Sequence, residues 1–146
     1  MHPNLPAHTS TTNAALPFAA PLEPNRRLLL YALRRMGAHG LNDAQAAQAM
    51  LAAFGMQYRR PLIMLRVFVQ ESAQMAARKI SITGCCCMRM TLDEARLTEA
   101  IATSESDVPG AALLLRQAMG TEQSLGALCA AQAVQAAFAD LGRPLN

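Results

Sequence analysis

The sequence predicts an all-α protein, a compact bundle of five or six helices behind a disordered N-terminal tail. Alanine, leucine and glutamine, which favour helices, are abundant, whereas aromatic residues make up only 4% of the 146 residues and tryptophan is absent. Apolar residues recur at helical spacing in several segments, and glycines follow these segments. Residues that favour strands are too scattered to predict a sheet. We expect a single helical domain at residues 24–146.

Residues 1–23 are predicted to form the disordered tail. They contain four of the eight prolines and the polar run Thr9–Asn13, without a helical or strand period. The tail lacks the basic and continuous apolar regions of a signal peptide, so we expect a cytoplasmic protein. The folded part should begin near Pro24, since proline suits a first helical turn.

The first predicted helix covers residues 24–37 and is amphipathic. Its apolar face carries Leu28, Leu29, Ala32, Leu33 and Met36. Arg27, Tyr31 and Arg34 lie opposite. Gly37 is the predicted stop, because glycine commonly follows the last residue of a helix.

Two further helices are predicted before the middle of the chain. The second covers residues 43–54, with Asn42 as its N-terminal cap. The third covers residues 62–79, where polar side chains recur every fourth residue in one narrow stripe. A helix with so little polar surface should be mostly buried.

Three helices are predicted in the second half. Thr91, followed three residues later by Glu94, forms a capping box and predicts a helix to about residue 103. A shorter helix is predicted at residues 108–119. The last helix begins within residues 121–124 and ends before the last glycine of the chain.

The net charge of +3 is divided unevenly along the chain. Residues 1–90 carry ten basic and three acidic side chains, whereas residues 91–146 carry three basic and seven acidic ones. Such a division attracts an anionic partner to one half, or lets the two halves attract each other. Our leading hypothesis is a non-enzymatic binding or regulatory protein that uses an arginine-rich face. The candidate residues of this face are Arg27, Arg34, Arg59 and Arg60.

The choice of partner is partly constrained. We do not expect a nucleic-acid partner. The helix at residues 43–54 would be the recognition helix of a helix-turn-helix, and it contains no Arg or Lys to bind phosphates. We expect no membrane span, since no uncharged apolar run reaches eighteen residues. A protein partner and a homo-oligomer held by alanine- and methionine-rich faces both remain open.

The consecutive residues Cys85, Cys86 and Cys87 carry the alternative hypothesis, a thiol-redox or metal-binding module. From an extended backbone only the first and third could point the same way. Zinc usually takes four ligands, so the others would have to include Cys129, His39 or the histidines of the tail. A second paired motif is missing, and we expect no other cofactor.

A reactive thiol needs nearby positive charge, which Arg78, Lys79 and Arg89 could supply. A third interpretation treats the cysteines as small apolar residues in a tight connection. The sequence favours a protein without enzymatic activity but does not decide the point. His39 has no Ser, Asp or Glu arranged with it, and Asp93 and Glu94 diverge by about 100° on a helix.

Four stretches carry a resemblance to a known family: RRLLLYALRRMGAHGLNDAQAAQAMLAAFG, YRRPLIMLR, CCCMRMTLDE and AQAVQAAFADLGRPLN. They resemble small, uncharacterised bacterial proteins known only as a domain of unknown function. The resemblance covers about residues 24–146 and leaves out the tail. It implies a stand-alone helical protein, and it brings no activity, cofactor or catalytic residue.

Overall fold

The computed structural model of the chain describes residues 16–84 and 86–146, and its fold is all-α, as predicted. Its elements are β1 (Phe18–Ala19), α2 (Pro24–His39), α3 (Ala44–Phe54), η1 (Gly55–Gln57), α4 (Arg59–Met75), β2 (Arg89–Met90), α5 (Leu92–Thr103), α6 (Val108–Met119) and α7 (Leu125–Asp140). The two short strands pair antiparallel. Most of the predicted tail, residues 1–15, lies outside the described residues, whereas β1 falls within its remaining part.

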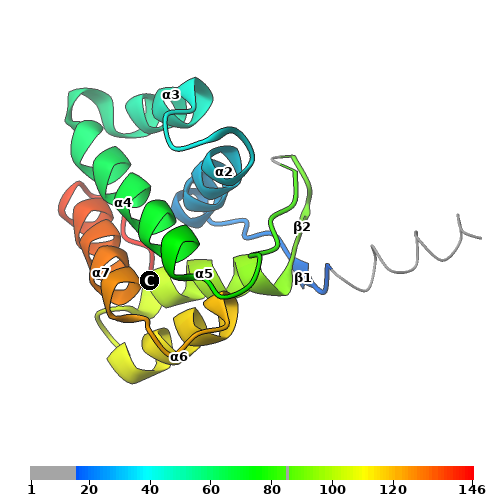
Figure 1. Cartoon of the computed structure of the whole chain (residues 1–146). Helices are drawn as coiled ribbons and strands as arrows, with labels where there is room; N and C mark the ends of the chain where they lie inside the picture. The colour runs from blue at the N-terminus through cyan, green and yellow to red at the C-terminus, as the bar shows by residue number, and fades with distance from the viewer. Residues whose placement is uncertain (1–15, 85) are drawn as a thin grey trace, which may run out of the picture.

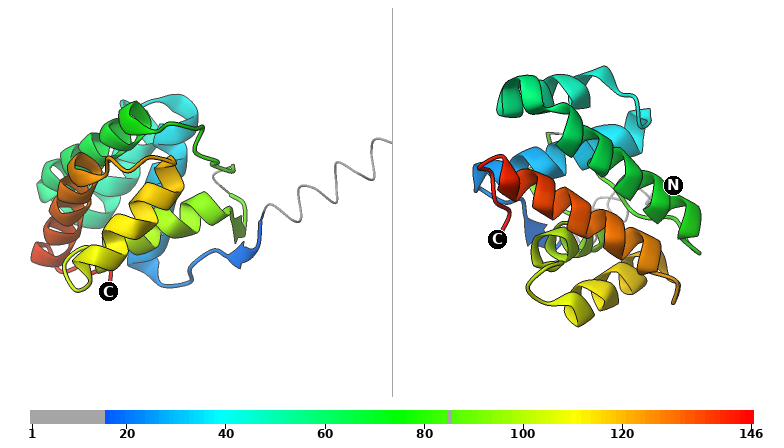
Figure 2. Two further views of the ribbon diagram at one scale, coloured as in Figure 1. Left: turned by 60° about the horizontal axis from the view of Figure 1, so that its bottom comes forward. Right: turned by 90° about the vertical axis from the view of Figure 1, so that its left-hand side faces the viewer.

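The helices pack into one bundle (Figure 1). α4 lies along α7 and α5 lies along α6, while α2 and α3 pack against α4 on the other side (Figure 2). The facing sides form one apolar core. Its fully buried large side chains include Leu29, Met50, Leu65, Phe68, Ile101, Leu115, Met119, Val134 and Phe138.

Two helix ends differ from the predicted ones. Gly37 is not the stop of α2, which continues to the glycine three residues further on. Gly40 follows the last residue of α2 and has a φ of 104°. Glycine adopts this positive φ readily because it has no Cβ, so the helix ends at this point. The cap of α3 is Asp43 rather than Asn42, because the Asp43 carboxylate accepts the Ala46 N–H at 2.9 Å.

The predicted helix at residues 62–79 is also displaced, since α4 begins and ends earlier. Residues 76–84 form neither helix nor strand, and we call them the strap. α4 buries only one face, because Ile63 and Val67 on the other face are 47% and 41% exposed. The prediction of a mostly buried helix is therefore wrong.

The remaining helix signals are confirmed. Glu94 N–H donates to Thr91 Oγ1 and Thr91 N–H donates to Glu94 Oε1, both at 3.0 Å, so the capping box forms. α6 has the predicted bounds, and α7 begins directly after Ser124. No helix of the described residues has the length and apolar character needed to cross a membrane.

Candidate functional site

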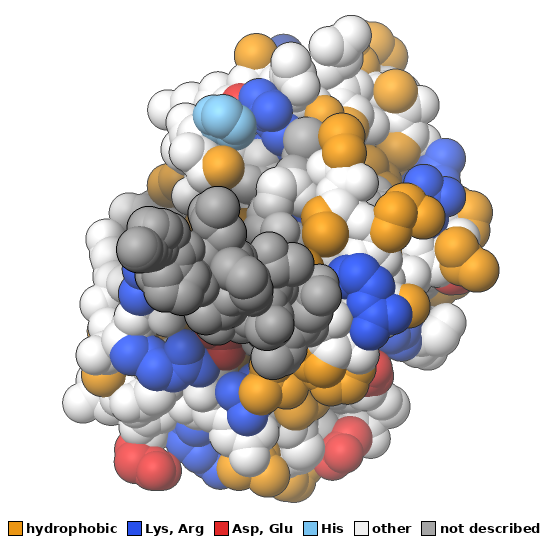
Figure 3. Space-filling view, turned by 90° about the vertical axis from the view of Figure 1, so that its right-hand side faces the viewer, with side chains coloured by type: hydrophobic (Ala, Val, Ile, Leu, Met, Phe, Trp, Pro, Cys, Tyr) orange, Lys and Arg blue, Asp and Glu red, His pale blue; other side chains and the backbone are white. Residues whose placement is uncertain are grey.

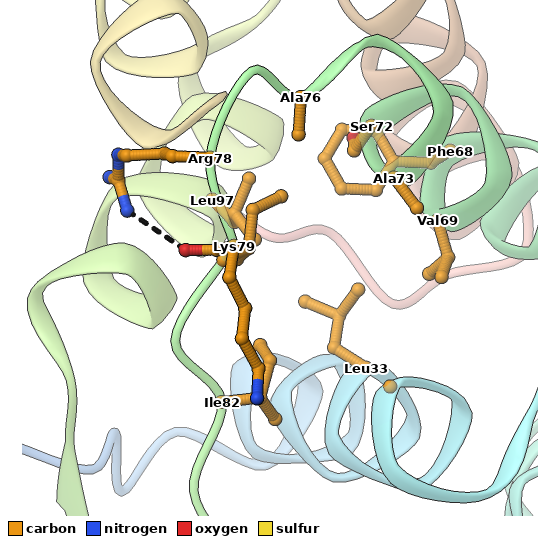
Figure 4. A pocket seen from close by; sticks show the side chains of 12 residues that line it. Leu33, Phe68, Val69, Ser72, Ala73, Ala76, Arg78, Lys79, Ile82 and Leu97 are labelled. Atoms are coloured by element: carbon orange, nitrogen blue, oxygen red, sulfur yellow. Dashed lines mark hydrogen bonds between the residues drawn. The ribbon is translucent and has the colours of Figure 1, made fainter. Parts of the chain in front are cut away.

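A cavity of about 340 Å³ lies between α4, α2, α5 and the strap (Figure 4). Its volume lies in the range of small-molecule sites, which is about 300–1,000 Å³. Ile82 of the strap lies against Gly37 in α2, where a Cβ would be 3.4 Å from the Ile82 side chain, close to ordinary van der Waals contact. The apolar walls are formed mainly by Leu33, Phe68, Val69, Ile80, Ile82 and Leu97.

Ser72, on the α4 wall, is the polar exception. The residue is 3% exposed, and its hydroxyl finds no hydrogen-bond partner in the described part of the chain. Helical serines and threonines usually satisfy such a hydroxyl on a carbonyl one turn back. Thr98, Thr103 and Ser104 do so here, at 2.8–2.9 Å. An unsatisfied buried hydroxyl costs about 1–3 kcal/mol, so Ser72 is held at the expense of stability.

Replacing Ser72 with alanine should therefore raise the free energy of unfolding by about 1 kcal/mol, because it removes the unpaired hydroxyl and improves helix propensity. Chemical denaturation of both proteins measures the difference. Ser104→Ala is the matched control. That serine is also buried, but it donates to Ile101 O, so its removal should destabilise by a similar amount. A loss of stability in Ser72→Ala like that in the control would contradict the interpretation.

A buried ion pair fixes the far end of the strap. Arg34 in α2 and Glu94 in α5 are 2% and 1% exposed, and Nε and Nη2 donate to the two carboxylate oxygens at 2.8 and 3.1 Å. The guanidinium also donates to the carbonyls of Cys87 and Arg89 at 2.7 Å. The same carboxylate accepts the Thr83 N–H at 3.1 Å. One ion pair thus ties the strap, β2, α2 and α5 together.

A second ion pair fixes the near end of the strap. The Arg78 guanidinium donates to both carboxylate oxygens of Asp93 at 2.6 and 3.0 Å, and Ser81 N–H donates to the same carboxylate at 2.8 Å. Burial raises the pKa of Asp93, but the hydrogen bonds from Arg78 and Ser81 and the charges of Arg78 and Arg96 outweigh it. The pKa of Asp93 therefore lies below its ordinary value, and the pair raises the pKa of Arg78.

One of the four arginines of the predicted face is buried, and another is paired on the surface. Arg34 was expected on an exposed face, but it is buried, because its charge is neutralised inside the protein. Arg60 pairs with Asp140 at 2.9 Å on the surface, and Arg27 and Arg59 are exposed. In the described part of the face in Figure 3, Lys and Arg side chains lie in separate groups.

Three of the four predicted thiol or metal residues, Cys87, Cys129 and His39, lie in the described part of the chain. Cys85 lies outside the described residues, and Cys87 is half-buried with its carbonyl bound by Arg34. Cys129 is exposed on α7, which lies across the molecule from the segment leading into β2 (Figure 1). His39 is exposed at the end of α2. Within the described residues, no group of three or more His, Cys, Asp and Glu could hold a metal ion.

The sequence held a signal for Ser72 that our interpretation did not use. Leu65, Phe68 and Ser72 follow one another at helical spacing, so a serine interrupts the apolar face of α4. The capping box explains Glu94 locally, and nothing in the neighbouring sequence points to the arginine partners of Asp93 and Glu94.

Comparisons with known proteins add a family but no activity. A family model described as "Family of unknown function (DUF6628)" matches residues 5–141. The match begins within the segment predicted to be a tail. No curated protein and no solved structure matches the chain.

Proposed function

Since the chain belongs to this family of unknown function, DUF6628, we propose its role from geometry alone: it binds a small, mostly apolar molecule in the cavity between α4 and the strap. The observation that carries the proposal is the buried, unpartnered Ser72 on an otherwise apolar wall. Apolar walls with a few placed polar groups are typical of small-molecule sites.

The size of the cavity limits the ligand. The volume of about 340 Å³ lies near the lower end of the range for small-molecule sites, which favours a small ligand. Each methylene that leaves water for such a site contributes about 0.8 kcal/mol. The Ser72 hydroxyl oxygen is buried, so a hydrogen bond to a ligand requires a rotation about χ1, for which serine has staggered alternatives.

The strap closes one side of the cavity. It has no regular secondary structure, but its backbone donates hydrogen bonds to Met119 O from Ala77, to the Asp93 carboxylate from Ser81 and to the Glu94 carboxylate from Thr83. The proposed ligand therefore lies between the helices and a segment that two ion pairs hold in place.

The arginine-rich face and the cysteine module receive less support. Arg34 is buried, and Arg60 pairs with Asp140. Of the four predicted residues, Arg27 and Arg59 remain for an arginine-rich face. A binding role is retained, but its location moves from the charged surface to the cavity.

The test is a fluorescence titration of the full chain with naphthol, a neutral and mostly apolar two-ring probe. We expect saturable binding to the unmodified protein and at least about a tenfold weaker affinity in Val69→Phe. Val69 lines the cavity, and the larger ring would fill part of it.

Val67→Phe is the matched control, because Val67 lies on the same helix two residues away and is not a wall residue of this cavity. It should bind naphthol as the unmodified protein does. Thermal melts must show both variants folded. Equal affinity in the two variants would overturn the proposed site.

A further inference from the structure

The rim of the cavity carries one uncompensated positive charge. Lys79, the only lysine of the chain, lines the cavity from the exposed strap, and its side chain runs toward Ile82 (Figure 4). No carboxylate of the described residues forms an ion pair with it. The other cation at the cavity, Arg78, is already bound by Asp93 and by the carbonyl of Gln117.

The two unpaired polar groups of the cavity differ in depth. Lys79 is exposed, whereas Ser72 is 3% exposed on the α4 wall, beside Phe68 in Figure 4. A charged group is far more costly to bury than a neutral one. A ligand that satisfies both therefore places its charge at the rim and a neutral hydrogen-bonding group in the interior.

We propose that the ligand is a compact monocarboxylate, with its carboxylate at Lys79, an apolar body between the helices, and a neutral hydroxyl or carbonyl group at Ser72. This inference rests on the proposed function and names the ligand class for the same cavity.

The number of charges favours a carboxylate over a phosphate monoester. A phosphate monoester carries close to two negative charges at neutral pH and is usually held by several donors. A single flexible ammonium matches one negative charge. A cationic ligand is disfavoured by repulsion from Lys79.

Competition against naphthol tests the proposal on the full chain, with octanoate, octanol and ω-hydroxyoctanoate as competitors. Lys79→Met should weaken octanoate up to about fivefold, since pairs at exposed sites are modest, and leave octanol unchanged. Arg59→Met removes an exposed charge away from the cavity and should change neither competitor.

Ser72→Ala addresses the interior group. It should weaken ω-hydroxyoctanoate about fivefold relative to octanoate, because only the hydroxylated ligand can pair with the serine. Octanoate, but not octanol, should slow the acetylation of Lys79, the only lysine of the chain. Mass spectrometry can follow this reaction.

The outcomes separate the two proposals. If naphthol does not bind, or binds equally to Val69→Phe and Val67→Phe, the proposed function fails. If naphthol binds as expected but Lys79→Met weakens octanol as much as octanoate, the cavity remains a site and the carboxylate class is overturned. If Ser72→Ala leaves ω-hydroxyoctanoate unchanged relative to octanoate, the interior hydrogen-bonding group is overturned.

Discussion

Replacing Arg34 with methionine should lower the free energy of unfolding by about 3–5 kcal/mol, because it leaves the Glu94 carboxylate buried without its counter-charge. The substitution also removes two donors from the carbonyls of Cys87 and Arg89. Methionine is apolar and unbranched, so loss of volume adds little. Urea denaturation measures the change.

Arg60→Met is the matched control for this experiment. Arg60 makes the same kind of contact with Asp140, at 2.9 Å, but the two side chains are 50% and 59% exposed. Exposed pairs contribute about 0–1 kcal/mol, so the control should lose less than about 1 kcal/mol. Similar losses in the two variants would contradict the view that burial makes the Arg34–Glu94 pair important.

The contrast between these arginines also shows what could be predicted from the sequence. The capping box at Thr91, the bounds of α6 and the all-α class could be predicted, because they depend on composition and on residues close together in the sequence. Arg34 lies one turn after Leu30 in α2, and both side chains are buried. The chain that covers that face, around Cys87 and Arg89, is more than fifty residues away in sequence.

The end of α4 and the cavity depend on similarly distant contacts. The helical pattern continues past Met75, but the chain leaves the helix, and Ala77 N–H donates to Met119 O of α6 at 2.9 Å. The strap forms where this contact begins. Ser72 and Lys79 can be recognised as cavity residues only once the strap has been placed over α4.

Replacing Asp93 with asparagine should lower the free energy of unfolding by about 1–2 kcal/mol at neutral pH. A hydrogen bond to a charged group contributes about 1.5–3 kcal/mol, and the lower end applies because Arg78 is 42% exposed. Asparagine can still accept the Ser81 N–H, so the loss reports mainly the charge paired with Arg78. Asp140→Asn, in the exposed pair, should change stability by less than about 1 kcal/mol.

The effect of Asp93→Asn should depend on pH, with a sign fixed by the lowered pKa. Because the folded pKa lies below the ordinary value of 3.8, the stabilisation is fully present above about pH 5 and is lost as the pH falls through the folded pKa. Asp43, whose hydrogen bond from Arg35 lowers its pKa to about 2, adds acid sensitivity to both proteins and cancels in the comparison. The stability gap between unmodified protein and variant should therefore stay constant from pH 7 to about 5 and narrow below about 4. A gap that stays constant down to about pH 2.5 would mean that the Asp93 charge does not hold the strap.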